Sequence, residues 1–207
     1  SAKGRIKMST ANSKVENIDI NSKEVLISSA EIKQRVEELG RRISADYQGR
    51  ELHLVGVLNG AFIFLADLVR QLSIPCQICF LQASSYKDKK VSSGEVTLMH
   101  NLDLSGKNVL IVEDIVDTGL TLKYILEDLR QQKPESIEIC ALLSKNIPDK
   151  APVPVKYVGF EIEDRFVVGY GLDFAEKYRE IPHIACLDYA ESWSADSSAK
   201  TETHVAH

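Results

Sequence analysis

The 207-residue chain has no long hydrophobic run and no excess of positive charge. No apolar stretch approaches the roughly 20 residues of a membrane-spanning helix, and the N-terminal residues lack the hydrophobic region of a signal peptide. The formal net charge of −5 argues against nonspecific binding to nucleic acid. We therefore expect neither a membrane nor a nucleic-acid partner. An anionic substrate is not excluded, because a metal ion and backbone amides can supply local positive potential.

Cysteine is scarce, and its spacing does not complete a metal site. Cys76 and Cys79 form a C-x2-C pair, but no second pair or histidine cluster accompanies it. A zinc site or a disulfide is the alternative to two thiols in the core of a strand. We favour reduced core thiols, which fits a cytoplasmic protein.

The remaining composition is that of one ordinary globular domain, with 44% hydrophobic and 27% charged residues. Residues 1–23 are polar and lack periodicity, so we predict a flexible N-terminal segment. Residues 24–190 form the predicted domain. Residues 191–207 are polar and poor in apolar side chains, which predicts a disordered tail.

One stretch, residues 108–130, reads NVLIVEDIVDTGLTLKYILEDLR and organises the rest of the chain. Residues 109–112 are unbroken apolar residues, typical of a strand covered on both faces. We place the end of this strand there, because the acids Glu113 and Asp114 follow directly and read as the start of a polar loop. A helix pattern begins at Leu122. Ligands bind at the carboxyl ends of such strands, where a helix N-terminus favours an anion.

The chemistry of this loop suits a phosphorylated sugar. Thr118 and Thr121 offer hydroxyls, and Gly119 allows the backbone to approach a phosphate closely. Amides at the start of the helix can donate to phosphate oxygens. The acids Glu113 and Asp114 would repel that phosphate, so we expect them to face sugar hydroxyls or Mg²⁺. The alternative is an ordinary acidic helix cap, since Asp and Thr are common cap residues.

The other strand and helix patterns alternate along the chain. A helix is predicted over residues 28–47, opening with a Ser28-x-x-Glu31 capping box. Strands are predicted over residues 53–58, 76–83, 137–143 and 184–187. The turn Asn59-Gly60 separates the first of these from a helix over residues 61–72. This alternation predicts an α/β fold with a doubly wound, mostly parallel sheet flanked by helices.

The segment EDIVDTGLT, residues 113–121, closely resembles the 5-phosphoribosyl pyrophosphate (PRPP) signature of the type I phosphoribosyltransferases. Within that superfamily it is similar to the 6-oxopurine branch, the hypoxanthine-guanine phosphoribosyltransferases, for which an acid at Asp117 is the narrower mark. Similar blocks continue over residues 25–188. The resemblance implies the type I phosphoribosyltransferase fold, with a small hood built from the terminal segments.

The resemblance also implies roles for individual residues. Asp117 would be the catalytic residue, acting on the purine N7 as general base or acid. Mg²⁺ would be the cofactor, with Glu113, Asp114 and Asp173 at the metal positions. The implied substrate-binding residues are Asn59, Gly60, Ser85, Tyr86, Glu113, Asp114, Ile115, Val116, Thr118, Gly119, Leu120, Thr121, Lys145, Arg165, Phe166, Val167, Asp173 and Arg179.

Several of these positions carry a specific expectation. VGVLNGAF resembles the pyrophosphate-contacting loop of the family, although many relatives have Lys or Arg where this chain has Asn59. Ser85-Tyr86 matches the start of a mobile lid over residues 84–96, whose alternative is a solvated surface loop. Lys145 would donate to the exocyclic carbonyl of the base. Phe166 would stack on the purine, and its alternative is a core aromatic, the commoner fate of such a side chain.

The expected activity is transfer of 5-phosphoribose from PRPP to N9 of hypoxanthine or guanine, giving IMP or GMP and pyrophosphate. Such a purine salvage enzyme would be a cytoplasmic homodimer or homotetramer. Two other classes remain open. An RNA-binding regulator on the same fold would require a basic surface, and the negative net charge of the chain argues against one. A non-catalytic nucleotide-binding module would lack turnover.

Overall fold

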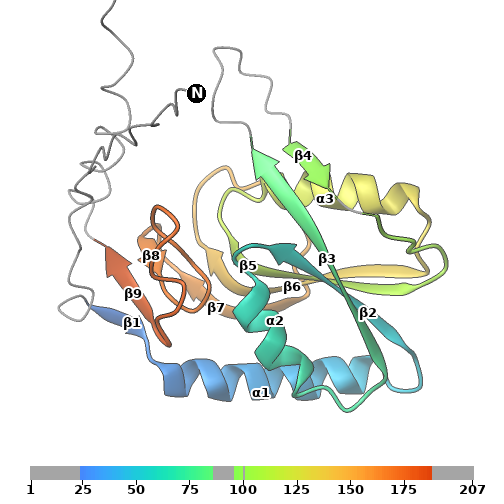
Figure 1. Cartoon of the computed structure of the whole chain (residues 1–207), viewed down its shortest axis with the longest axis horizontal. Helices are drawn as coiled ribbons and strands as arrows, with labels where there is room; N and C mark the ends of the chain where they lie inside the picture. The colour runs from blue at the N-terminus through green and yellow to red at the C-terminus, as the bar shows by residue number, and fades with distance from the viewer. Residues whose placement is uncertain (1–23, 86–95, 100, 188–207) are drawn as a thin grey trace, which may run out of the picture.

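The computed structural model describes residues 24–85, 96–99 and 101–187, which form two β-sheets flanked by helices (Figure 1). The larger sheet has the strand order β4-β3-β2-β5-β6-β7, and only the β3–β4 pair is antiparallel. Its strands are β2 (Leu52–Leu58), β3 (Cys76–Ser85), β4 (Val96–Met99), β5 (Asn108–Val116), β6 (Ser136–Lys145) and β7 (Tyr157–Ile162). The expected doubly wound, mostly parallel sheet is confirmed.

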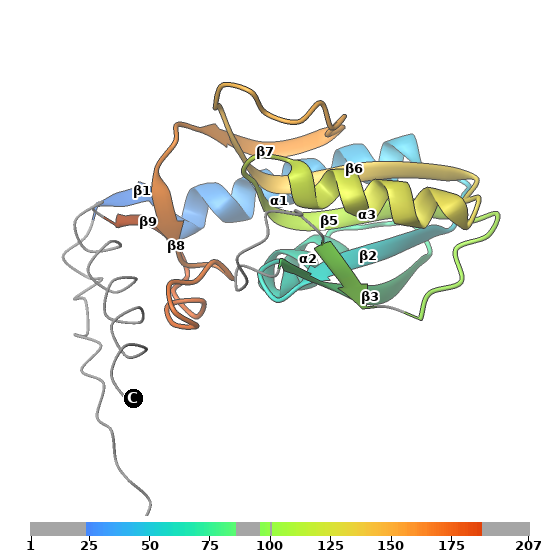
Figure 2. The same cartoon turned by 90° about the horizontal axis from the view of Figure 1, so that it is seen from above.

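Helices cover both faces of this sheet and create two cores. Helices α1 (Ser29–Asp46) and α2 (Phe62–Val69) lie on one face, and α3 (Leu120–Gln131) lies on the other (Figures 1 and 2). Ile43 and Phe64 pack with Leu110 in the first core, whereas Ile111 and Ile125 pack in the second. Successive side chains of a strand point to opposite faces, so a strand buried on both faces needs apolar residues at every position. This explains the unbroken apolar run in β5.

Helix α1 begins where the sequence predicts. Ser28 is its N-cap, and the Ser28 amide donates to Glu31 Oε2 at 2.8 Å while the Glu31 amide donates to Ser28 Oγ at 3.3 Å. These reciprocal bonds satisfy two of the amides that a helix leaves unpaired at its start. None of the helices in the described part of the chain is long and apolar enough to cross a membrane.

A smaller antiparallel sheet forms the hood. It joins β1 (Val25–Ile27), β9 (Ile184–Leu187) and β8 (Phe166–Val168), in that order. The N-terminal strand and the C-terminal strand therefore lie side by side, as expected for a hood built from the terminal segments. In both views the hood lies beyond the carboxyl ends of the parallel strands (Figures 1 and 2). That is the edge at which an open α/β sheet binds its ligands.

Three expectations need correction. Strand β5 continues past the acids to Val116, because its backbone still pairs with β6 as far as the Val116–Ser144 register, so Glu113 and Asp114 lie within the strand. Helix α2 ends at Val69 rather than at residue 72, because the Gln71 amide bonds to Leu68 in a turn. Third, Cys76 and Cys79 were expected in the core but are only half-buried, whereas Cys140 and Cys186 are buried; none of these four described cysteines forms a disulfide.

The predicted lid, residues 84–96, lies largely outside the described residues, and Tyr86 falls in that part. The predicted N-terminal segment and C-terminal tail also lie outside the described residues.

Candidate active site

The ends of β5 and β6 bring an acid and a base together. Val116 pairs with Ser144 in the sheet. Asp117, the residue after β5, and Lys145, the last residue of β6, therefore meet at the same edge of the sheet. The Lys145 Nζ lies 3.5 Å from Asp117 Oδ2 and 3.1 Å from Asp164 Oδ1. The Lys145 side chain is only 11% exposed, whereas that of Asp117 is 56% exposed. The ammonium is therefore held in place from both sides, and the carboxylate of Asp117 stays accessible to a ligand.

Two acids in β5 form a buried pair. Asp114 is 8% exposed, and Glu113 keeps some exposed surface although its Oε2 is enclosed and accepts no hydrogen bond. Burial, followed by the negative charge of Asp114, raises the pKa of Glu113 well above its usual range. Burial also raises the pKa of Asp114. For both carboxyls, burial outweighs the interactions that favour the ionised form.

Glycine allows the turn after β2 to lie against this acidic pair. A Cβ at Gly60 would overlap with the Asp114 carboxyl, and a Cβ at Gly171 would overlap with the Gly60 carbonyl. Asn59, joined to Leu58 by a cis peptide bond, precedes Gly60 and is exposed. Gly60 and Asp114, both expected among the substrate-binding residues, thus lie together, and Gly171 of the hood segment lies against Gly60.

Arg179 and Asp173 occupy the hood side of the same region. Arg179 Nη1 lies 3.0 Å from Asp173 Oδ1 and donates to the Gly171 carbonyl at 2.8 Å. The positive charge of Arg179 is also among the influences that lower the pKa of Asp114, although burial outweighs them. The ion pair of Arg179 with Asp173 therefore lies close enough to Asp114 for its positive charge to act on that carboxyl.

The predicted phosphate loop surrounds a small cavity of about 130 Å³, lined by residues 113–119 together with Thr121 and Leu122. Gly119 is the N-cap of α3 with a φ of 79°, in the left-handed region that favours glycine, and it has no side chain with which to cap the helix. Thr118 Oγ1 accepts a bond from the Leu120 amide at 3.4 Å. Other amides of the first turn remain for an anion, which helix N-termini favour. Ile115 and Val116 contribute to the wall of this cavity.

The hood contributes the aromatic side chain at the other end of the site. Phe166 is half-buried in β8 and packs edge-to-face on Phe174, with ring centroids 5.6 Å apart. Arg165 Nη2 bonds to Glu24 Oε2 at 2.6 Å, and the Arg165 amide donates to the Glu163 carbonyl at 2.8 Å. The Arg165 side chain and amide are thus engaged within the hood. Val167 is buried beside them.

Lys150 belongs to the site but was missed by sequence reasoning. Its Nζ donates to the Lys145 carbonyl and to Ser144 Oγ, each at 2.8 Å. The following residue, Ala151, donates from its amide to the Thr118 carbonyl at 2.8 Å. This connection therefore braces both the end of β6 and the phosphate loop. A lysine in a proline-rich linker gave no signal of that contact.

The acidic pair fits a divalent cation. The enclosed Glu113 Oε2 has no hydrogen-bond partner, and a cation beside it would supply both a contact and the missing positive charge. In residues 24–85, 96–99 and 101–187, no group of three or more His, Cys, Asp or Glu side chains converges on one metal position. The other ligands of an ion bound here would therefore be substrate oxygens and water.

A doubly wound sheet whose strand ends carry a phosphate loop, a buried acidic pair and a hood defines the class of protein. The phosphoribosyl transferase domain model matches residues 24–175, so the chain belongs to the phosphoribosyltransferase family. Its relatives narrow this class further. The chain is 48% identical to the hypoxanthine-guanine phosphoribosyltransferase of Dictyostelium discoideum, covering 80% of this chain and 96% of the relative. It belongs to the hypoxanthine-guanine branch of that family.

Other proteins of this branch agree in sequence and in structure. The chain is 46% identical to the hypoxanthine phosphoribosyltransferase of Escherichia coli K12, over 78% of this chain and 93% of the relative. A crystal structure of the Bacillus anthracis hypoxanthine-guanine enzyme superposes with a TM-score of 0.74 at 41% identity, covering 79% of this chain and 96% of that chain. The Staphylococcus aureus hypoxanthine enzyme gives a TM-score of 0.75 at 43% identity, covering 80% and 91%.

Proposed function

We propose that the protein is a purine salvage enzyme that transfers the 5-phosphoribosyl group of PRPP to N9 of hypoxanthine or guanine. The bond between the ribose C1 and the pyrophosphate oxygen breaks, a bond between C1 and N9 forms, and pyrophosphate leaves. The product is IMP or GMP. The observation that carries this proposal is the Asp117–Lys145 pair at the ends of β5 and β6, beside a loop suited to phosphate.

The spacing of that pair matches the edge of a 6-oxopurine. O6 and N7 lie next to each other on one edge of guanine, and both are acceptors in the nucleoside. Lys145 would donate to O6, and Asp117 would take the proton that N7 carries in the free base when N9 attacks. The 3.5 Å between Lys145 Nζ and Asp117 Oδ2 allows one base to contact both groups. Phe166 would stack on the purine face.

The other residues bind PRPP. The hydroxyls and amides of the loop from Asp117 to Thr121 would hold the 5′-phosphate. Glu113 and Asp114 would hold Mg²⁺ on the ribose side, directly or through water, and Asp173 would adjoin a second ion near pyrophosphate. Mg²⁺ held there would neutralise charge on the pyrophosphate leaving group. Arg179 would contact pyrophosphate together with the Asn59-Gly60 turn.

Turnover tests this function directly. The purified protein is mixed with PRPP and Mg²⁺, and nucleotide formation is measured with hypoxanthine, guanine, adenine or no base. We expect IMP and GMP but essentially no AMP, because the amino group of adenine would face Lys145 with two donors and no acceptor. Absence of turnover with every base would favour a non-catalytic nucleotide-binding module. Tight RNA binding that persists at high salt would favour a regulator.

We also propose that the enzyme is a homo-oligomer in the cytoplasm. Ile78 and Phe80 share one face of β3 and are 47% and 45% exposed. Phe80 lies near Leu65 of α2, the helix on which Phe62 is 44% exposed. This apolar row suits a second copy of the chain. Light scattering should give at least a dimer that Phe80→Glu dissociates, whereas Tyr124→Glu on α3 should not. Four described cysteines without a disulfide suit a reducing compartment.

A further inference from the structure

The hood segment around Tyr170 has an uncommon backbone. Gly169, Tyr170 and Gly171 have φ angles of 99°, 50° and 101°, all in the region that favours glycine. The two glycines adopt such angles readily, but a tyrosine rarely does. Strained backbone persists only where surrounding contacts hold it. The contacts of Tyr170 therefore explain why this conformation is kept.

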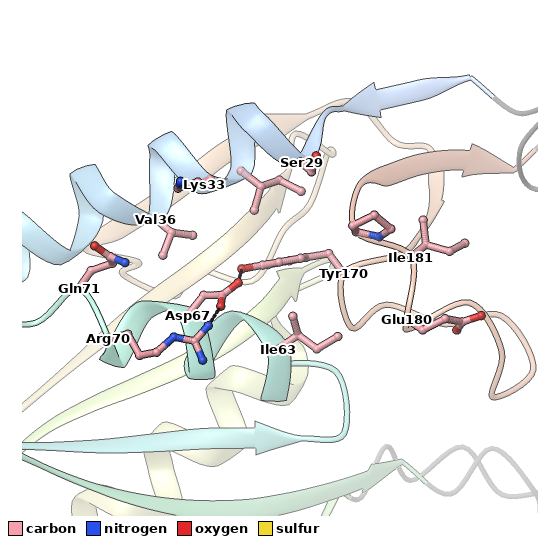
Figure 3. Close-up of a pocket in the computed structure, with 12 residues that line it drawn as sticks. Ser29, Lys33, Val36, Ile63, Asp67, Arg70, Gln71, Tyr170, Glu180 and Ile181 are labelled. Carbon is pink, nitrogen blue, oxygen red and sulfur yellow. Dashed lines mark hydrogen bonds and ion pairs between the residues drawn. The ribbon is translucent and has the colours of Figure 1, made fainter.

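The side chain of Tyr170 ties the hood to α2. It is 6% exposed, and its hydroxyl donates to Asp67 Oδ2 at 2.5 Å. Figure 3 shows the ring reaching from the hood segment to Asp67, which is also paired with Arg70. Burial, followed by the bond to Asp67, raises the pKa of the Tyr170 hydroxyl. The hydroxyl therefore stays protonated and remains a donor at physiological pH.

This bond is more than a consequence of packing. A cavity of about 460 Å³ lies between α1, α2 and the hood, and Tyr170 forms part of its wall with Val36, Ile63 and Ile181 (Figure 3). A ring beside a cavity has fewer neighbours to fix it than one in a close-packed core. The hydroxyl bond to Asp67 is thus the principal directional restraint that the structure places on this side chain.

The next residue carries the restraint to the acidic pair. Gly171 lies so close to the Gly60 carbonyl that a Cβ on Gly171 would overlap with it. A Cβ on Gly60 would likewise overlap with the Asp114 carboxyl. Gly171 and Arg179 also exchange bonds: the Gly171 amide donates to the Arg179 carbonyl at 2.9 Å, and Arg179 Nη1 donates to the Gly171 carbonyl at 2.8 Å. A shift of Tyr170 would therefore move both the Gly60 turn and Arg179.

We infer that Tyr170, held by Asp67, is a positioning residue that seats the hood on the Gly60 turn and thereby sets the affinity for PRPP. The inference rests on the proposed function, because it assigns Gly60, Asp114 and Arg179 to the PRPP side of the site. Tyr170 itself does not touch substrate. Base recognition depends on Lys145 and Asp117 at the ends of β5 and β6, and on Phe166, which pairing with Leu187 of β9 holds in place. The KM for hypoxanthine should therefore change less than the KM for PRPP.

The test removes one hydroxyl. Tyr170→Phe keeps the ring and deletes the bond to Asp67, and we expect an approximately tenfold rise in KM for PRPP with KM for hypoxanthine within about twofold of the unmodified value. Calorimetric titration with Mg²⁺ and PRPP, without base, should show a similar rise in Kd. Asp67→Ala should reproduce this effect. Asp67→Asn should retain near-normal affinity, because the amide oxygen still accepts from Tyr170.

A matched control is available in the same core. The hydroxyl of Tyr157, which is fully buried, donates to Asp46 Oδ2 at 2.8 Å, far along α1 from the hood segment. Tyr157→Phe deletes the same kind of bond and should lower Tm without changing either KM. The inference is overturned if Tyr170→Phe leaves PRPP affinity unchanged, raises both KM values equally, or behaves like Tyr157→Phe.

Two further comparisons keep the result decisive. If Tyr170→Phe does not fold, Asp67→Ala against Asp67→Asn answers the same question, and equal PRPP affinity in those two variants overturns the inference. The double variant Tyr170→Phe with Asp67→Ala should be no worse than either single variant, because both remove one bond. If the unmodified protein turns over no base, the proposed function fails; PRPP titration of the variants still tests the positioning role separately.

Discussion

The substitution Glu113→Gln keeps the shape of a buried side chain and removes its ability to carry charge. Burial and the neighbouring Asp114 raise the pKa of Glu113 in the folded protein above the value of about 4.5 that it has when unfolded. The folded state therefore binds more protons than the unfolded state between these two values. Stability contributed by the protonated form is present below the unfolded-state pKa and is lost as pH rises through the folded-state pKa.

The magnitude follows from this linkage. Each unit by which the pKa of Glu113 is raised corresponds to about 1.4 kcal/mol of stability lost once the carboxyl ionises. A protein of this size gains roughly 2–4 °C in Tm per kcal/mol. Glutamine cannot ionise, so Glu113→Gln should raise Tm by roughly 3–6 °C per pKa unit at pH 8 in the absence of Mg²⁺. At pH 4 the two proteins should melt together.

The assay is a series of melting curves from pH 4 to pH 8.5 in EDTA, repeated with Mg²⁺ and PRPP. The unmodified protein should gain the larger stabilisation from Mg²⁺ and PRPP, because the variant has lost a carboxylate ligand. Glu127→Gln, which changes an exposed acid on α3, is the control and should show neither effect. A variant that is less stable than the unmodified protein at pH 8, or a Tm difference independent of pH, would refute the reasoning.

Three other substitutions probe separate parts of the site. Asp117→Asn should lower kcat by about two to four orders of magnitude, the usual contribution of a general base, while PRPP titration stays near normal; near-normal turnover would exclude that role. Lys145→Met should raise KM for hypoxanthine more than KM for PRPP. It should also narrow the preference for hypoxanthine over adenine, since adenine leaves the buried Lys145 donor unpaired at a cost of about 1–3 kcal/mol. Good use of adenine by the unmodified enzyme would contradict this role of Lys145. Gly60→Ala should destabilise the protein by about 1–3 kcal/mol and abolish PRPP binding, because the new Cβ overlaps with Asp114; an unchanged Tm would count against that contact.

Local patterns predicted most of the elements but misplaced one important boundary. The capping box at Ser28 follows from short-range chemistry, and it is confirmed. The end of β5 was predicted four residues early because Glu113 and Asp114 are charged. Strand pairing depends on the backbone, and β6 supplies partners as far as Val116. Charged residues within a strand are unfavourable for packing, so their presence here is a mark of function rather than of a loop.

Contacts between distant segments were the part that sequence could not predict. The bonds from Lys150 depend on how the linker after β6 folds back, and the pairing of Lys145 with Asp164 depends on the turn after β7. The close approach of Gly171 to Gly60 joins residues more than one hundred positions apart. No periodicity reports such a contact, because it requires the whole sheet to be assembled first. The resemblance supplied candidate residues, and the fold supplied the distances between them.

The glycine contact between the hood and the Gly60 turn has a consequence for how this enzyme can evolve. Because Gly171 and Gly60 meet through backbone atoms and a Cβ at either position would overlap with its neighbour, the seat of the hood requires glycine at both positions. Phe166 and Arg165 project from other parts of the hood and can vary without altering that seat. The specificity for the acceptor base can therefore diversify by substitution while the machinery for the phosphoribosyl donor is inherited unchanged. A laboratory library restricted to the base-facing positions should accordingly yield new acceptor preferences at little expense of donor affinity.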